Sequence, residues 1–141
     1  TAEISRYFQW VHGLDRLKHA ERLSRQRPGD LPPLQVCIQV NLSGEASKGG
    51  VVPQDLTALA TAVARMPRLR LRGLMTMPDP GAPPTSQTAA FAGLRRLLDE
   101  LKVQGLELDT LSMGMSADME AAIAEGSTIV RIGTDIFGRR D

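Results

Sequence analysis

The sequence predicts an α/β fold with a parallel sheet, contained in a single domain of residues 1–141. Short apolar runs rich in β-branched residues alternate with longer segments of helical period, which is typical of consecutive βα units. The 141 residues suffice for one hydrophobic core. A complete (β/α) barrel needs about 250 residues, so the chain forms either a doubly wound sheet or an incomplete barrel.

Four strands are expected from the apolar runs. The first of these runs, residues 34–40, follows the Pro32–Pro33 breaker. The other three occupy residues 69–75, 108–113 and 129–132. A weaker strand candidate, residues 8–12, precedes them all.

Four helices are expected between the strands. Leu14, Leu17 and Ala20 lie on one face of the first helix, which ends near residue 28. The second begins at Pro53, a residue favoured in a first helical turn, and is ended by Pro67.

A third helix is expected over residues 91–104 because leucines recur there at helical spacing, and Gly105 is its C-terminal stop. A short fourth helix is expected over residues 116–126 and ends at Gly126. The proline-rich residues 78–84 predict a loop.

Composition excludes several classes of function. The 17 Lys and Arg residues against 16 Asp and Glu leave a formal charge of +1, so a nucleic-acid partner is not expected. Polar residues interrupt every apolar run, so no membrane span is expected. His12 and His19 have no metal-ligand partners at suitable spacing.

The single cysteine, Cys37, favours a reducing compartment, and we expect a cytoplasmic protein. The first residue is Thr1 rather than Met, which indicates a processed or truncated product.

Two strand ends near the C-terminus carry hydroxyl groups beside glycines. Ser116 follows one strand and Gly133–Thr134 follows the next. In parallel α/β proteins ligands bind beyond the C-terminal ends of strands, where free N–H groups and hydroxyls form anion sites. A phosphate cradle is one interpretation. From spacing alone, a helix cap at Ser116 and a simple turn at Gly133–Thr134 are the commoner explanation.

Arg131 and Met115 are further candidates at these strand ends. Arg131 lies between apolar residues, and a buried guanidinium needs a carboxylate or a ligand as partner. The alternative is an outward side chain, or a pair with Asp109 or Asp135. Met115 belongs to a group of methionines near strand ends, which fill the core or form a soft wall around a planar ligand.

Four blocks of sequence carry a resemblance to a known family. They are NLSGEASKGG at 41–50, LRGLMTM at 71–77, LSMGMSADMEAAI at 111–123 and RIGTDIFG at 131–138. In this order they closely resemble the pyridoxal 5′-phosphate (PLP) homeostasis proteins, the YggS/PROSC-like family, over essentially the whole chain. The resemblance implies a (β/α)8 barrel of PLP fold type III, like the N-terminal domain of alanine racemase. It also implies a non-catalytic protein that stores, carries or buffers the cofactor.

The same resemblance implies a set of cofactor-binding residues. Ser116, Gly133 and Thr134 would hold the phosphate, with Met115 beside them. Arg131 would face the pyridine nitrogen and keep it unprotonated, because a cation disfavours a second positive charge nearby.

The chain departs from the family in lacking the lysine that binds PLP as a Schiff base. The three lysines are Lys18 and Lys102, on predicted helices, and Lys48, which matches a Ser-Lys-x-Gly loop of the family. We therefore expect the C-terminal part of a family member, with weak PLP binding. Its two open sheet edges predict self-association or pairing with a missing N-terminal part, whereas full-length relatives are expected to be monomers.

Two other interpretations of the function remain open. One is a fragment of a PLP-dependent racemase or decarboxylase, although the only tyrosine, Tyr7, precedes the first strand and offers no acid/base group at a strand end. The other is a generic phosphate-binding α/β protein.

Overall fold

The computed structural model describes residues 10–42, 49–77, 83–115 and 123–131. Strands and helices alternate along these residues. The elements are β1 (Trp10–Leu14), α2 (Leu17–Gln26), β2 (Leu34–Gln39), α3 (Pro53–Ala64), β3 (Leu69–Met75), α4 (Pro84–Val103), β4 (Thr110–Met115) and β5 (Ile129–Arg131). Within them no helix is long and apolar enough to cross a membrane.

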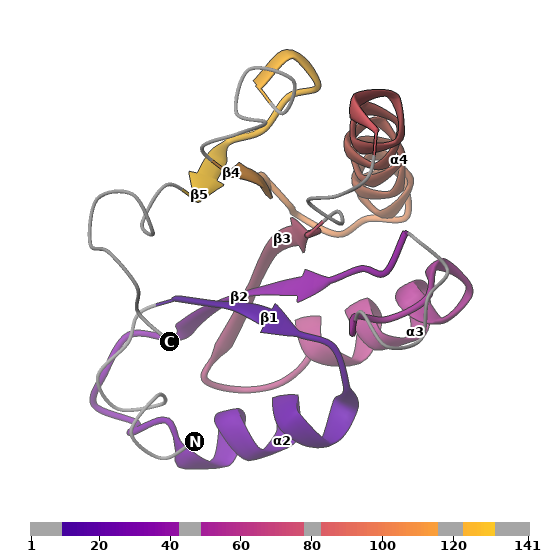
Figure 1. Cartoon of the computed structure of the whole chain (residues 1–141). Helices are drawn as coiled ribbons and strands as arrows, with labels where there is room; N and C mark the ends of the chain where they lie inside the picture. The colour runs from indigo at the N-terminus through magenta and orange to yellow at the C-terminus, as the bar shows by residue number, and fades with distance from the viewer. Residues whose placement is uncertain (1–9, 43–48, 78–82, 116–122, 132–141) are drawn as a thin grey trace.

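The five strands form one parallel sheet in the order β1-β2-β3-β4-β5. Each strand therefore pairs with the next one along the chain, whereas a doubly wound sheet reverses its strand order at a switch point. Right-handed connections then place successive helices on one face of the sheet, and α2, α3 and α4 cover its outside in Figure 1. The sheet has the arrangement of consecutive units of an incomplete barrel.

The hydrophobic core lies between the outer face of the sheet and the helices. Leu14, Ile38, Leu74 and Leu111 follow one another in register across β1 to β4, and all are buried. The helices contribute buried side chains to the same cluster: Leu23, Leu56, Leu59, Ala60, Val63, Phe91, Leu94, Leu98 and Leu101. Burial of this apolar surface is the main force that holds the helices to the sheet.

The inner face of the sheet is more polar. His12 of β1 and Ser112 of β4 are joined by a hydrogen bond of 2.7 Å between Nδ1 and Oγ, although β2 and β3 lie between their strands. Side chains of strands one and four can meet only if the sheet curves strongly around its inner face. The curvature is that of a barrel wall.

The first strand differs from its prediction. It covers residues 10–14 instead of 8–12, and residues 8–9 lie outside the described part of the chain. Leu14, expected on the apolar face of a helix, instead ends the strand. It is fully buried opposite Ile38, and this burial decides the strand's register. The helix that follows begins at Leu17.

Several other elements also differ in extent from their predictions. α4 begins at Pro84 rather than at Phe91, because proline is tolerated in a first helical turn; the predicted loop thus loses its last residue, and 78–82 lie outside the described residues. β4 covers Thr110–Met115 instead of residues 108–113, and β2 ends at Gln39 instead of residue 40. Of the predicted fourth helix, residues 123–124 are helical, residues 125–126 form a turn, and residues 116–122 lie outside the described residues.

Candidate functional site

The C-terminal ends of the parallel strands meet at one edge of the sheet, which is where ligands bind in barrels and other parallel α/β proteins. Met115 is the last residue of β4 and Arg131 the last residue of β5. The two are direct partners in the strand register. The structure therefore places these two predicted site residues side by side at this edge, called the ligand edge below. Ser116, Gly133 and Thr134 lie outside the described residues.

Hydrogen bonds from a buried threonine stiffen the middle of the ligand edge. Thr76, at 2% exposure, directly follows β3. Its hydroxyl donates to the carbonyl of Val40 at 3.1 Å, and its backbone N–H donates to the carbonyl of Ser112 at 3.2 Å. Thr76 thus ties the ends of β2, β3 and β4 together, and a fixed edge suits a binding site.

A turn of two glycines lies over the ends of β1 and β2. The N–H of Gly50 donates to a carboxylate oxygen of Asp15, the residue that follows β1, at 3.0 Å. Val51 bonds to the end of β2 as an isolated parallel bridge with Val40. Asp15 was not predicted from the sequence; the available signal was an acidic residue immediately after a strand that ends at the ligand edge.

The opposite edge of the sheet is held by an ion pair. Arg72 donates to both carboxylate oxygens of Asp109, at 2.9 and 2.7 Å, and to Gln35 at 2.9 Å. Its guanidinium lies 5.0 Å from the centre of the Trp10 ring, at cation–π distance. The hydrogen bond from Arg72 lowers the pKa of Asp109, and Thr110 adds to this effect. Because Asp109 precedes β4 and Arg131 ends β5, the arrangement argues against their pairing.

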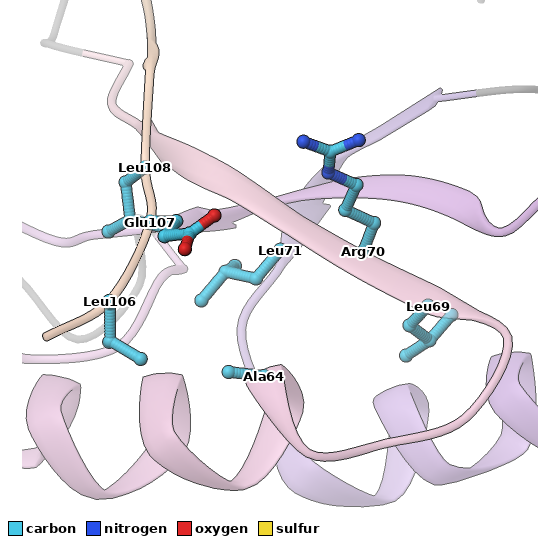
Figure 2. A pocket seen from close by; sticks show the side chains of 7 residues that line it. All are labelled: Ala64, Leu69, Arg70, Leu71, Leu106, Glu107 and Leu108. Carbon is cyan, nitrogen blue, oxygen red and sulfur yellow. The ribbon is translucent and has the colours of Figure 1, made fainter.

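A cavity of about 220 Å³ opens at this opposite edge, near the start of β3 and before β4 (Figure 2). It is lined by Ala64, Leu69, Arg70, Leu71, Leu106, Glu107 and Leu108. Arg70 extends to the other side of β3 from Ala64 and Leu71, as alternation along a strand requires (Figure 2). The cavity lies at the opposite end of the strands from the ligand edge, so it is not the candidate site.

The fold and its ligand edge define a barrel-type α/β protein, and comparison with known proteins specifies the class. The family model described as "Alanine racemase, N-terminal domain" matches residues 1–141. The chain therefore belongs to this family.

The most similar curated relatives share one name. The chain is 64% identical over 141 residues to the pyridoxal phosphate homeostasis protein of Pseudomonas aeruginosa and 52% identical over 138 residues to that of Escherichia coli. It spans 60% and 59% of the lengths of these relatives. The resemblance found in the sequence is confirmed, whereas the placement of the chain as the C-terminal part stays a prediction.

Solved structures agree with the family. PipY of Synechococcus elongatus without PLP superposes with a TM-score of 0.88 at 36% identity, covering 97% of this chain and 65% of that one. PipY with PLP bound gives a TM-score of 0.85 at 35% identity, covering 98% and 66%. D-threonine aldolase of Filomicrobium marinum, at 21% identity and a TM-score of 0.71 over 89% and 36% of the two chains, shares the fold alone.

Proposed function

We propose that this chain is part of a PLP-binding protein of vitamin B6 homeostasis, which carries or buffers the cofactor without transforming a substrate. Two findings support the proposal. The relatives that bear the homeostasis name match over the whole chain, and PipY, of similar fold, has been solved with PLP bound. The reducing compartment expected from the single, buried Cys37 is consistent with a cytoplasmic role.

The observation that carries the proposal is the pairing of Met115 with Arg131 at the ligand edge. PLP is a planar pyridine ring with a phosphate and an aldehyde, and it would supply an aldehyde that condenses with amines and an electron-poor ring. Arg131 would face the ring nitrogen and disfavour its protonation. Ser116 directly follows β4 in the sequence, and Gly133 and Thr134 follow β5 closely, so these residues would hold the phosphate.

The lysines support a non-catalytic role for this chain. None of the five described strands contains a lysine. Lys18 lies in α2 and Lys102 in α4, both helices on the outer face, and Lys48 is outside the described residues. A PLP enzyme needs a lysine at the reacting centre and a second acid–base group. We therefore propose that the chain supplies the C-terminal, phosphate-binding part of the barrel.

A titration tests the proposal. PLP added to the chain should give a saturable change in its visible absorbance that pyrophosphate and a sugar phosphate at equal concentration do not reverse. Arg131→Gln should weaken PLP binding about tenfold, the value of one charge-assisted contact. Arg70→Gln, which removes an exposed arginine near the opposite edge, is the matched control and should bind like the wild type. If pyrophosphate and the sugar phosphate instead compete with PLP as well as PLP itself binds, the site is a generic phosphate site.

A further inference from the structure

Asp15 is placed to control the shape of the ligand edge. It follows β1 directly, and its side chain is only 24% exposed. Its Oδ2 accepts the N–H of Gly50 across 35 positions of sequence, at 3.0 Å. A hydrogen bond with one charged partner is stronger than a neutral one, and partial burial protects it from solvent.

The turn held by Asp15 admits only glycine at Gly50. Gly49 and Gly50 both have positive φ, at 73° and 95°, a region that other residues rarely adopt. A Cβ on Gly50 would lie 2.9 Å from the backbone nitrogen of Asn41 and 3.1 Å from the carbonyl carbon of Val40. The turn therefore packs directly onto the backbone at the end of β2.

The far side of the turn is bonded to the sheet. The N–H of Val51 donates to the carbonyl of Gln39, and the N–H of Asn41 donates to the carbonyl of Val51, both at 2.8 Å. Residues 49–51 are thus fixed to β2 by two backbone bonds and to the end of β1 by the Asp15 carboxylate. Asp15 is the side-chain contact by which β1 holds this turn.

The turn lies at the same end of the sheet as Met115, the last residue of β4. His12 lies three residues before Asp15, and Ser112 lies three residues before Met115; their hydrogen bond brings β1 and β4 face to face across the inner side of the sheet. The ends of these two strands therefore border the same opening. The Gly49–Gly50 turn, bonded to Asp15 after β1 and to the end of β2, lies at this same end of the sheet.

We propose that Asp15 is a positioning residue of the PLP site: it holds the Gly49–Gly50 turn as the wall that retains the cofactor. This inference rests on the proposed function and adds a residue that the resemblance did not supply. Loss of the carboxylate leaves the two bonds to β2 in place, so the turn stays attached to the sheet but moves away from the opening. The consequence is faster PLP dissociation rather than unfolding.

The experiment compares Asp15→Ala, Asp15→Asn and Arg16→Ala. Asn keeps an acceptor oxygen for Gly50, so Asp15→Asn is the conservative rescue. Arg16→Ala is the matched control, because Arg16 Nε lies 3.5 Å from the other carboxylate oxygen while its side chain is 78% exposed, a pair of little energetic value. Three quantities are measured on each variant: the PLP dissociation rate, the hydrogen exchange of the Gly50 amide by NMR, and the unfolding midpoint.

Asp15→Ala should raise the PLP dissociation rate about three- to tenfold and the Gly50 exchange rate at least about tenfold, with little change in unfolding midpoint. Asp15→Asn should bring the PLP dissociation rate and the Gly50 exchange rate most of the way back to the wild-type values. Arg16→Ala should match the wild type in both rates. Unchanged PLP dissociation despite faster Gly50 exchange would overturn the inference, and so would unchanged Gly50 exchange. Failure of the wild-type chain to bind PLP at all would overturn the proposed function itself, which separates the two failures.

Discussion

Gly73 marks the closest approach between β3 and β4. A Cβ at this position would lie 1.7 Å from the carbonyl oxygen of Thr110, its partner in the strand register. Any side chain would have to push the two backbones apart, and these backbones carry the middle of the sheet. Gly73→Ala should therefore lower the free energy of unfolding by about 3 kcal/mol or more, or prevent folding.

Gly93, inside α4, is the matched control for Gly73. A Cβ added to Gly93 would lie 3.8 Å from the nearest side-chain atom of Leu42, an ordinary contact distance. Gly93→Ala should stabilise the chain by about 0.5–1 kcal/mol, because alanine is the better helix former. Urea unfolding of the two variants measures both effects. Similar stabilities for the two would contradict the packing at Gly73.

The His12–Ser112 hydrogen bond makes a second prediction at the residue scale. The pair joins β1 to β4 over 100 positions of sequence, and Ser112 is fully buried. A double-mutant cycle of His12→Phe and Ser112→Ala should give a coupling energy of about 1 kcal/mol in urea unfolding. A coupling near zero would show that the two strands do not meet across the inner face.

At the scale of elements, the sequence predicted which segments form strands and helices better than it predicted where they begin. Short apolar runs identified the five strands of the described residues, the first of them as a weaker candidate, because strands buried against helices are apolar. The start of α4 at Pro84 was missed because proline disrupts a helix interior but not its first turn. The displacement of β1 was missed because Leu14 suits the apolar face of a helix as well as the buried end of a strand.

The Arg72–Asp109 pair joins β3 to the start of β4 and predicts a pH dependence. The hydrogen bond from Arg72 lowers the pKa of Asp109 from its usual 3.8. A carboxyl whose pKa is lowered on folding stabilises the folded chain above its unfolded pKa, and this contribution disappears as the pH falls through the lowered value. The Asp109 side chain is 58% exposed, so solvent screens the pair and its contribution is about 0.5–1 kcal/mol at most.

Asp109→Asn should consequently be slightly less stable than the wild type at pH 7, and the difference should disappear as the pH falls through the lowered pKa of Asp109. Asp99→Asn, at an exposed position of α4, is the control. Urea unfolding at several pH values measures the difference. A gap between wild type and Asp109→Asn that grows as the pH falls would contradict the sign of the effect.

At the scale of the whole molecule, the sequence located part of the candidate site. Met115 and Arg131 were found because strand ends in parallel proteins share one edge, and the register confirms that they are neighbours. Asp15 with Gly50, and His12 with Ser112, were not found. The two residues of each pair are 35 and 100 positions apart. The pairing of β1 with β2 brings Asp15 to Gly50, and the curvature of the sheet brings His12 to Ser112.

The absence of lysine from the described strands leads to a prediction about the whole chain. Members of the family are expected to hold PLP covalently on a strand-end lysine, whereas Lys18 and Lys102 lie on the outer helices. PLP bound by this chain should therefore be removed by dialysis, and borohydride treatment should leave no stoichiometric adduct by mass spectrometry. The pyridoxal phosphate homeostasis protein of Pseudomonas aeruginosa, treated identically, is the positive control. A one-to-one adduct on this chain would mean that one of its three lysines reaches the ligand edge. It would contradict reversible, non-covalent binding of PLP by this chain.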